Sequence, residues 1–589
     1  MLFETKVLII RFIFISSMTK NETSNQPVRR VTGSEGLLLS LIEEGVDTIF
    51  GYPGGAIMPV YDHLYDYKDK LNHILVRHEQ GAAHAAEGYA RVTGKVGVCL
   101  VTSGPGATNL TTGLADAMID STPVICISGQ VLAPLLGSDA FQETDVMGFS
   151  MPITKWNIQI TRAEEIPAII AKAFFIARTG RPGPVMVDIT KDAQFAEFDY
   201  YYAKCDDIRS YVPRPTLDRD QLAEAARLIN TSKRPLALVG QGVLLSRTET
   251  EVMSLLERAE IPAAWTLLGK SALPFDHPLN VGMLGMHGNY GPNIKTNESD
   301  LIIALGMRFD DRVTGNLNFY AKQARIIHFE IDPSEVDKNV KTDVAVIADL
   351  RDSMKELLPL INENKHPEWL NQFKNAYQYE YEKIMEKDLF PSKEGLTMAE
   401  VIRRINEQTD GNAILVTDVG QHQMIACRYF KSRHPRSVIT SGGLGTMGFG
   451  LPASFGAKTG RPDMTVIAII GDGGIQMTIQ ELGTIAQDKT AIKIVLMNNN
   501  FLGMVRQWQQ LFFDKRYSFT ELKNPDFIGI ANAYGIAGRR ISRREEMDDA
   551  VRQLLSSDGP FLLEVMVEKE DNVFPMVPTG ASVSDIRLE

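Results

Sequence analysis

The segment 466–500, VIAIIGDGGIQMTIQELGTIAQDKTAIKIVLMNNN, constrains the fold of this chain more than any other stretch. One apolar run ends in Gly471-Asp472-Gly473, and a second ends in Asn498-Asn499-Asn500. The 24 residues from 474 to 497 predict one crossover helix between two buried strands. Strands joined in this way are parallel neighbours, so Asp472 and Asn499 are expected at adjacent carboxyl ends, where open α/β sheets bind ligands.

The same succession of apolar strand, Gly-rich turn and helix recurs along the 589 residues. Continuous Val, Ile and Leu runs without polar alternation indicate parallel sheets covered on both faces. The predicted fold class is therefore α/β, with three open, mostly parallel α/β domains. The expected divisions are a disordered leader at 1–30, a first domain at 31–195, a linker at 196–217, a central domain at 218–360, a connecting segment at 361–396 and a third domain at 397–589.

Composition excludes several classes of function. The net charge is -12 and no block of five basic residues occurs, which argues against nucleic acid or an anionic membrane as partner. Four scattered cysteines without a C-x-x-C pair argue against a disulfide framework or a zinc site, and favour a reducing compartment. The apolar run 7–15 is too short to span a bilayer. It is predicted to be a disordered leader or an upstream start, with a targeting segment as the alternative.

The chemistry expected at the carboxyl ends of the two strands is Mg²⁺ bridging a diphosphate. Mg²⁺ prefers hard oxygen ligands and takes few of them from the protein, so Asp472, the amide oxygen of Asn499 and one backbone carbonyl would suffice. The glycines allow backbone to approach the phosphates, and the following helix N-terminus favours negative charge. A lone GDG is more often a tight turn with Asp as helix N-cap, but the Asn cluster at crossover spacing favours the metal site.

A second unusual carboxylate is Glu79 in ILVRHEQGAAHAAEGYAR. It follows a short apolar strand and precedes a helix of mostly Ala and Gly, which permits another backbone to come very close. By itself this pattern leaves two interpretations open, a capping or solvated glutamate and a functional carboxylate.

The GDG and Asn motifs resemble the diphosphate-binding motif of thiamine diphosphate-dependent enzymes. The segments FGYPGGAIMPVYD, TSGPGATN, AFQETD, GRPGPVMVDITKD, GMRFDDRVTG, SGGLGTMGFGLPA and NNNFLGMVRQWQ closely resemble the acetohydroxyacid synthase (acetolactate synthase) family of large catalytic subunits. The resemblance covers essentially Thr32 to Pro578.

That resemblance implies a role for each matching residue. Glu79 would contact the aminopyrimidine of the cofactor and favour its reactive imino form, while Asp472, Asn499 and the backbone oxygen of Phe501 would hold the metal. The chain departs from the family at Phe501-Leu502, where polar residues are often found, although a backbone ligand tolerates the change. The other thiamine diphosphate residues implied are Val419, Gly420, Gln421, His422, Gly445, Met447, Gly471, Gly473 and Gly474. Gly55, Gln142, Lys191, Met447, Met504 and Trp508 would line the reaction pocket or its mouth.

The central domain resembles the FAD-binding domain of the same family. Its VGQGVLL lacks the third glycine of G-x-G-x-x-G and is a weak signal alone. Arg308 and Arg312 could neutralise a pyrophosphate, and Glu330 and Asp349 could bind ribose or adenine edges. The FAD residues implied are Arg181, Gly240, Gly242, Thr266, Met286, His287, Gly306, Arg308, Asp310, Arg312, Glu330 and Asp349, and the FAD itself would be largely structural.

The implied activity is decarboxylation of pyruvate and condensation of the hydroxyethyl intermediate with pyruvate or 2-oxobutanoate, in branched-chain amino-acid biosynthesis. The implied partners are these 2-oxo acids, further copies of the chain in a homodimer or tetramer with active sites at the subunit interface, and a small regulatory subunit. Alternatives are a pyruvate oxidase, a catabolic acetolactate synthase, or a non-catalytic regulatory homologue. The expected location is the cytoplasm, with the plastid as alternative.

Overall fold

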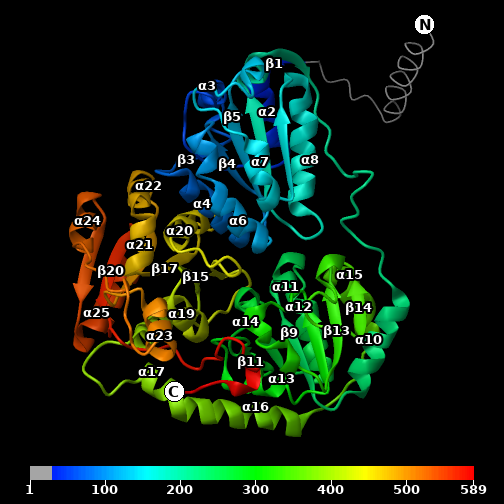
Figure 1. Ribbon diagram of the computed structural model, residues 1–589, viewed down its shortest axis with the longest axis vertical. Coiled ribbons are helices and arrows are strands. Elements are labelled where there is room, and N and C mark those ends of the chain that lie inside the picture. Colours follow the sequence, from blue (N-terminus) through cyan, green and yellow to red (C-terminus); the bar gives the residue numbers. More distant parts are fainter. Residues whose placement is uncertain (1–28) are drawn as a thin grey trace.

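The computed structural model describes residues 29–589 and contains three six-stranded sheets, each flanked by helices (Figure 1). Every paired strand within the three sheets runs parallel to its neighbour. The predicted α/β class with three open parallel domains is therefore confirmed. The predicted leader, residues 1–30, lies almost wholly outside the described residues.

The first sheet has the order β3-β2-β4-β5-β7-β6. Its strands are β2 (Thr48–Gly51), β3 (Asn72–Leu75), β4 (Gly97–Val101), β5 (Val124–Gln130), β6 (Trp156–Ile160) and β7 (Val185–Thr190). Its helices are α2 (Gly33–Glu43), α3 (Met58–Tyr67), α4 (Glu79–Thr93), α5 (Pro105–Thr108), α6 (Thr111–Ile119), α7 (Val146–Ser150), α8 (Ile166–Arg178) and α9 (Lys191–Phe195). Strands β4, β5 and β7 are buried at every position, as their uninterrupted apolar runs predict.

The central sheet has the order β11-β10-β9-β12-β13-β14. Its strands are β9 (Pro235–Val239), β10 (Ala263–Trp265), β11 (Asn280–Met283), β12 (Leu301–Leu305), β13 (Arg325–Glu330) and β14 (Val344–Ile347). Its helices are α10 (Arg219–Thr231), α11 (Gln241–Ser246), α12 (Glu249–Ala259), α13 (Tyr290–Thr296), α14 (Asp311–Thr314) and α15 (Leu350–Leu357). The connecting segment then supplies α16 (Pro367–Glu380) and α17 (Glu386–Leu389), and α16 runs along the base of the molecule in Figure 1.

The third sheet has the order β16-β15-β17-β18-β20-β19. Its strands are β15 (Ala413–Thr417), β16 (Val438–Ile439), β17 (Thr465–Gly471), β18 (Ile492–Asn498), β19 (Ala537–Ile541) and β20 (Phe561–Met566). Its helices are α18 (Met398–Thr409), α19 (Gln421–Tyr429), α20 (Gly450–Gly460), α21 (Asp472–Met477), α22 (Leu482–Gln487), α23 (Gly503–Phe512), α24 (Phe527–Ala533) and α25 (Met547–Ser556). Strands β17 and β18 pair in parallel, as the opening motif predicts.

The crossover between β17 and β18 differs from the single helix expected. Helix α21 ends at Met477, a 3-10 turn covers Ile479–Glu481, and α22 follows. Thr478 lies between them with φ of -136°, outside the helical region, and its Oγ1 donates to the carbonyl oxygen of Gly448 at 2.9 Å. A tertiary hydrogen bond therefore breaks the helix.

The stretch 196–217 is not purely a linker. Strand β8 (Glu197–Tyr200) pairs antiparallel with β1 (Arg29–Thr32). Phe198 packs against Val31 in a small apolar cluster, while Arg30 Nε donates to the carboxylate of Glu197 at 2.9 Å. Buried Phe198 alternates with outward-facing acids, a pattern that suits a strand with one covered face. The polar and aromatic composition of this stretch predicted a linker and not this strand.

Helix α4 packs directly against α20 of the third domain (Figure 1). A Cβ on Gly456 of α20 would lie 1.9 Å from the carbonyl oxygen of Ala85 on α4, so the two backbones are in contact. One continuous apolar core runs through both domains, with the rings of Phe50 and Phe455 6.2 Å apart. The expectation that the small-residue helix admits a second backbone is confirmed.

The last residues of the chain return to the central domain. Val577 N donates to the carbonyl oxygen of Met286 at 2.8 Å, and Asn297 Nδ2 donates to Ser584 Oγ at 2.8 Å. The stretch predicted as the end of the third domain thus packs against central-domain loops. Among residues 29–589, no helix combines the length and the apolar character that crossing a membrane requires.

Candidate active site

A small cavity of about 50 Å³ opens at the carboxyl ends of β15, β17 and β18. It brings together nearly all the residues predicted around the diphosphate and the metal. The lining includes Val419, Gly420, Gln421, His422, Met447, Gly471, Asp472, Gly473, Gly474, Asn499, Phe501 and Met504. Gly445 lies instead in the wall of a larger neighbouring cavity.

Oxygen atoms converge beside Asp472. Asn524 Nδ2 donates to Asp472 Oδ2 at 2.7 Å, to Asn498 Oδ1 at 3.0 Å and to Asn500 Oδ1 at 3.2 Å. Burial raises the pKa of the Asp472 carboxyl to about 6, and the Asn524 hydrogen bond opposes that rise. The Asp472 carboxylate and the amide oxygens of Asn498 and Asn500 thus converge on the neutral amide NH₂ of Asn524. Hard oxygen donors of this kind fit a cation such as Mg²⁺.

The Asn cluster itself is held by its own strand end. Asn499 Oδ1 accepts from Phe501 N at 3.2 Å, and Asn498 Nδ2 donates to Glu564 of β20 at 2.8 Å. Asn500 adopts a left-handed φ of 56°, a conformation that Asn tolerates better than most residues. This turn lets the chain leave β18 and enter α23 above the cavity.

His422 forms another side of the small cavity. A Cβ on Gly471 would lie 2.7 Å from its ring, so the glycine allows the imidazole to rest against the end of β17. Burial lowers the pKa of His422 to about 4, which keeps the ring neutral, and its Nε2 has no hydrogen-bond partner among the described residues. A buried ring nitrogen of this kind fits a cavity that receives a polar ligand.

Asp418 was not predicted as a site residue. It is fully buried, and its carboxylate accepts from Gly450 N at 2.8 Å, Val419 N at 2.8 Å and Gly448 N at 3.0 Å. It therefore fixes the backbone on both sides of the cavity, including the residue after Met447. Its position at the end of an apolar strand, like that of Asp472, is the signal that could have identified it. Asn524 lies in a loop and carries no such signal.

A larger cavity of about 1610 Å³ lies between the central and third domains and extends to the first. It collects the residues predicted for FAD together with several predicted for the reaction pocket. Its lining includes Arg181, Gly242, Thr266, Met286, His287, Gly306, Arg308, Asp310, Arg312, Glu330, Asp349, Val419, Gly420, Gly445, Met447, Met504 and Trp508. Gly240 is not in this lining, although its neighbour Gln241 is.

Some polar side chains in this cavity already have structural partners. Asp310 Oδ1 accepts from Arg312 N of α14 at 3.0 Å, and Asp349 Oδ1 accepts from Arg351 N of α15 at 2.9 Å, so both act as helix N-caps. Arg181 Nη1 donates to Glu335 Oε1 at 2.7 Å. Burial raises the pKa of Glu330 to about 7. Arg308 and Arg312 supply positive charge, and with the cavity volume they fit a large anionic ligand such as a dinucleotide.

Trp508 lies on α23, half-buried, with its ring 5.1 Å from that of Phe512. It lines the large cavity together with Met504, one turn earlier on the same helix. The structure thus places Trp508 at a cavity wall.

Glu79, Gly55, Gln142 and Lys191 form a separate group at the carboxyl edge of the first sheet. Gly55 follows β2, Glu79 follows β3, and Lys191 follows β7, while Gln142 O lies close to Gly104 after β4. Glu79 is buried, and its Oε2 accepts from Asn109 Nδ2 at 2.9 Å. None of these four residues lines the cavity that contains Asp472.

Comparisons with known proteins agree with this three-part arrangement. Residues 31–149 match the N-terminal TPP binding domain of thiamine pyrophosphate enzymes, residues 222–357 match their central domain, and residues 418–565 match their C-terminal TPP binding domain.

Full-length relatives narrow the family. The chain is 45% identical over 559 residues to the acetolactate synthase isozyme 2 large subunit of Escherichia coli (strain K12), which covers 94% of this chain and 99% of that protein. It is 45% identical over 569 residues to a probable acetolactate synthase large subunit of Methanocaldococcus jannaschii, a match that covers 94% of this chain and 95% of that protein. It is 44% identical over 575 residues to the acetolactate synthase large subunit of Corynebacterium glutamicum, a match that covers 95% of this chain and 90% of that protein. With three matching domains around the cavities described above, the chain belongs to the acetolactate synthase large-subunit family of thiamine pyrophosphate enzymes.

Proposed function

We propose that this protein is the catalytic subunit of an acetolactate synthase that uses thiamine pyrophosphate, Mg²⁺ and FAD. It would decarboxylate pyruvate and join the two-carbon unit to a second pyruvate or to 2-oxobutanoate. The observation that carries the proposal is the oxygen cluster at Asp472 and the Asn498–Asn500 turn, in a chain related to acetolactate synthases over nearly its full length.

Thiamine pyrophosphate supplies, when bound, the electron sink that loss of CO₂ from a 2-oxo acid requires. Asp472, Asn499 and the carbonyl oxygen of Phe501 would hold the metal that neutralises the diphosphate. Helix α21 begins directly after Gly471, and its first backbone N–H groups would favour the negative charge of the same anion. Asp418 keeps the backbone around Met447 in place, and Glu79 would hold or move a proton at the aminopyrimidine.

The direct test is an assay of the purified protein with pyruvate, thiamine pyrophosphate, Mg²⁺ and FAD. We expect acetolactate, and a mixture with acetohydroxybutanoate once 2-oxobutanoate is added. Omission of thiamine pyrophosphate or Mg²⁺ should abolish both products. Phosphate-dependent oxygen uptake with release of acetyl phosphate, and no acetolactate, would identify a pyruvate oxidase instead and overturn the proposal.

Retention of FAD is supported by the large cavity and by Arg308 and Arg312 in its wall. The absorbance spectrum of the purified protein should show bound flavin. Removal of the flavin should abolish activity. In the loaded enzyme the flavin should keep its redox state during turnover, because the proposed reaction transfers no net electrons.

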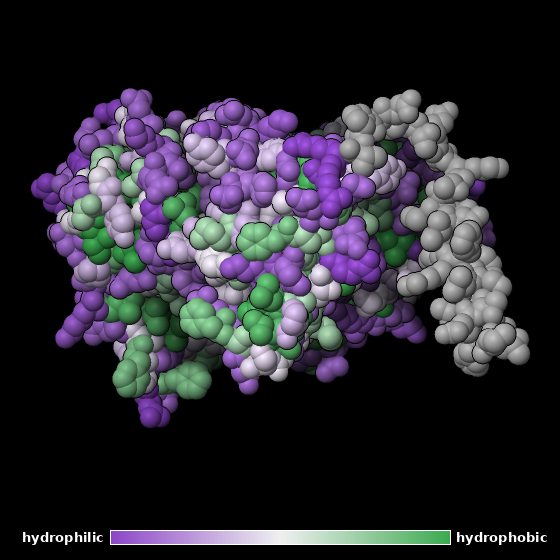
Figure 2. All heavy atoms as spheres, turned by 90° about the horizontal axis from the view of Figure 1, so that it is seen from above, coloured by the Kyte–Doolittle hydropathy of each residue, from purple (hydrophilic) through white to green (hydrophobic). Residues whose placement is uncertain are grey.

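We further propose that a second copy of the chain completes each active site. Glu79 does not line the Asp472 cavity. Large apolar side chains are exposed in two regions. In the first domain, in the loops that also carry Gly55 and Gln142 or close to them in sequence, they are Tyr52, Met58, Leu132, Leu135 and Phe141. On the third domain they are Met477, Val505, Phe512, Phe513 and Phe519. Phe141 is 88% exposed and Phe519 fully exposed, which is costly in water and typical of a surface covered by a partner. Figure 2 shows hydrophobic patches interrupting a hydrophilic surface on one face of the molecule.

Complementation tests where the two halves of the site come from. Glu79→Gln and Asp472→Ala chains are expected to be inactive when each is alone. In a mixed dimer, an active site built across the interface would contain the intact Glu79 of one chain and the intact Asp472 of the other, and activity should return. If each site lies within one chain, no mixed dimer is active, and the interface proposal fails while the chemistry proposed above stands.

A small regulatory subunit is a further proposed partner, supported by relatives that are named large subunits. Co-expression with a candidate small subunit and light scattering of the purified sample would test it. We expect a larger complex with raised activity, and recovery of the catalytic chain alone would count against this partner.

A further inference from the structure

The strip 440–447, TSGGLGTM, forms a wall shared by the two cavities. It connects β16 to the start of α20. Ser441, Gly442, Gly443, Leu444 and Gly445 line the large cavity, and Met447 lines both the large and the small cavity. The shape of both cavities therefore depends on where this strip lies.

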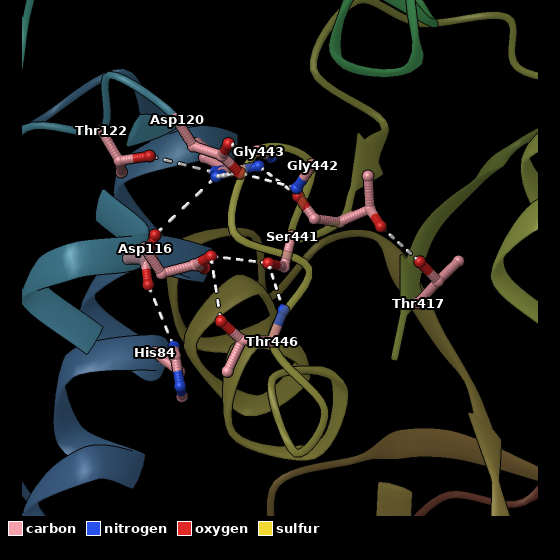
Figure 3. A network of polar contacts seen from close by, with 12 residues as sticks. His84, Asp116, Asp120, Thr122, Thr417, Ser441, Gly442, Gly443 and Thr446 are labelled. Atoms are coloured by element: carbon pink, nitrogen blue, oxygen red, sulfur yellow. Dashed lines mark hydrogen bonds and ion pairs between the residues drawn. The ribbon is translucent and has the colours of Figure 1, made fainter. Parts of the chain in front are cut away.

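Two carboxylates from the first domain hold the strip. Asp120 Oδ2 accepts from Gly442 N at 2.8 Å, and Asp120 Oδ1 accepts from Gly443 N at 2.6 Å. A Cβ on Gly443 would lie 2.9 Å from Asp120 Oδ1, so the glycine permits this close approach. Figure 3 shows Asp120 at the first-domain side of the strip, facing these two backbone groups.

The second carboxylate is Asp116 of α6. Its Oδ1 accepts from Ser441 Oγ at 2.6 Å and from Thr446 Oγ1 at 3.2 Å. Ser441 Oγ also accepts from Thr446 N at 2.8 Å, which closes the strip into a loop around the Asp116 carboxylate (Figure 3). Both ends of the loop are thus tied to one first-domain side chain.

Burial and charge make these contacts strong. Asp116 and Asp120 are both inaccessible to solvent. Arg91 of α4 donates to Asp120 Oδ2 at 2.8 Å and also to the carbonyl oxygen of Thr440. The Arg91 guanidinium is a permanent cation in proteins, and hydrogen bonds from backbone N–H groups to a carboxylate are stronger than neutral ones.

The same network continues into the first domain. His84 Nδ1 lies 3.0 Å from Glu87 Oε1, and one ligand atom each of His84, Glu87 and Asp116 falls within 4.8 Å of the others. Glu87 Oε2 and Asp116 Oδ2 lack hydrogen-bond partners among the described residues. Burial raises the pKa of Glu87 well above its usual range, with Asp116 as the next cause. The raised pKa favours a protonated Glu87, and Arg91 Nη2 supplies positive charge 3.7 Å from its Oε2.

We propose that Asp120, with Asp116, is a positioning residue for thiamine pyrophosphate: from the first domain it fixes the strip 440–447 and thereby sets Met447 and the wall between the two cavities. This inference rests on the proposed role of the small cavity in cofactor binding. Its distinctive consequence is that loss of a first-domain carboxylate weakens cofactor binding to the third domain.

A matched contact between the same two domains provides a control. Arg77 Nη2 donates to Gln487 Oε1 at 2.9 Å and to the carbonyl oxygen of Gly483 at 3.2 Å. None of these three residues lines either cavity. Gln487→Ala therefore removes an interdomain hydrogen bond without touching the strip.

The experiment measures thiamine pyrophosphate binding to the full chain in Mg²⁺, by calorimetry, for wild type, Asp120→Asn and Gln487→Ala. The asparagine keeps the volume but replaces one acceptor oxygen by an NH₂ group facing a backbone N–H. We expect the Kd of Asp120→Asn to rise about 10- to 100-fold, from loss of hydrogen bonds to a charged group. The Kd of Gln487→Ala should equal that of wild type, and kcat of Asp120→Asn at saturating cofactor should fall much less than its affinity.

Ser441→Ala covers the case in which Asp120→Asn does not fold. It removes only the hydroxyl that links the strip to Asp116, and its Kd should rise about 3- to 10-fold. A lowered melting temperature with unchanged Kd in the folded variants, or an equal rise in Kd for Gln487→Ala, overturns the proposal. If wild type itself binds no thiamine pyrophosphate, the proposed function fails; if wild type and all variants bind equally, only the positioning role fails.

Discussion

A Cβ on Gly88 of α4 would lie 2.1 Å from the carbonyl oxygen of Ala453 on α20. The atom in the way is backbone, so a side chain at this position cannot be accommodated by a rotamer change. The contact joins the helix that begins with Glu79 to the helix that follows the strip 440–447, and its closeness fixes the first domain on the third.

Gly88→Ala is therefore expected to push α4 and α20 apart. Overpacking of a close-packed interior costs about 1–3 kcal/mol, and a backbone clash belongs at the upper end or beyond. The melting temperature of the purified protein should fall clearly. Gly559→Ala is the matched control, because a Cβ at Gly559 meets nothing within 4 Å and its φ is not left-handed; equal melting temperatures for the two variants would contradict the packing argument.

Glu79→Gln should leave the fold intact and reduce turnover. Proposed proton transfer at the aminopyrimidine depends on the carboxylate, and general acid–base contributions amount to about 10²–10⁴-fold. The cofactor should still be retained, because the Asp472 cavity is untouched. Asn109→Ala, which removes the 2.9 Å hydrogen bond to Glu79 Oε2, should reduce kcat less. Near-normal turnover of Glu79→Gln would remove Glu79 from the chemistry.

Asp472→Ala should abolish retention of thiamine pyrophosphate. Asp472 is the one carboxylate among the described residues lining the small cavity, and a hard-cation site does not survive its loss. Gel filtration in Mg²⁺ followed by cofactor analysis checks this. Asn524→Ala serves as comparison, since it removes the donor to Asp472 but no proposed ligand, and it should retain more cofactor. Full retention by Asp472→Ala would place the metal site elsewhere.

Much of the fold follows from local pattern. Apolar runs such as 466–470 predict buried parallel strands because both faces of each sheet are covered, and β17 occupies that run. The glycines and acids directly after these runs predict the ligand-binding edge, because open parallel sheets bind ligands at the carboxyl ends of their strands. These features require only neighbours in sequence.

Other features depend on contacts between distant residues. Asp120 and Gly443 are 323 positions apart, and nothing near either residue indicates that they meet. The break at Thr478 likewise results from a hydrogen bond to Gly448, and β8 exists because β1 lies beside it. The domain boundaries, the individual site roles and the cellular location stay predictions.

Asp188→Asn should change how stability depends on pH. Asp188 is fully buried on β7 and accepts from Ser128 Oγ at 2.6 Å and Gln159 Nε2 at 2.8 Å. Burial raises its pKa to about 6, against an unfolded value of 3.8. Between these values the folded state binds more protons than the unfolded state, so stability falls as pH rises through this window and is level above it.

Urea midpoints of wild type and Asp188→Asn between pH 4 and pH 7 measure the effect. As pH rises across this range, the free energy of unfolding of the wild type should fall by up to about 3 kcal/mol relative to that of the variant. This figure comes from roughly two pKa units at 1.36 kcal/mol each. Asp558→Asn, at an exposed position, controls for loss of one charge. A constant difference between wild type and Asp188→Asn would show that the carboxyl titrates alike in both states.

Trp508→Leu tests acceptor choice. Trp508 is half-buried in the wall of the large cavity beside Met504, where its ring presents a broad apolar surface. We predict that this surface favours the ethyl group of 2-oxobutanoate over the methyl group of pyruvate. One methylene in an apolar pocket is worth about 1–3 kcal/mol, or about 10–200-fold in selectivity. The leucine variant should therefore keep acetolactate formation and selectively lose acetohydroxybutanoate.

If Trp508 served only to pack α23 against Phe512, its loss would instead lower stability and both products together. Both products are measured from one mixture of pyruvate and 2-oxobutanoate, with Phe512→Leu as the packing control, and an unchanged product ratio in Trp508→Leu would exclude the selectivity role.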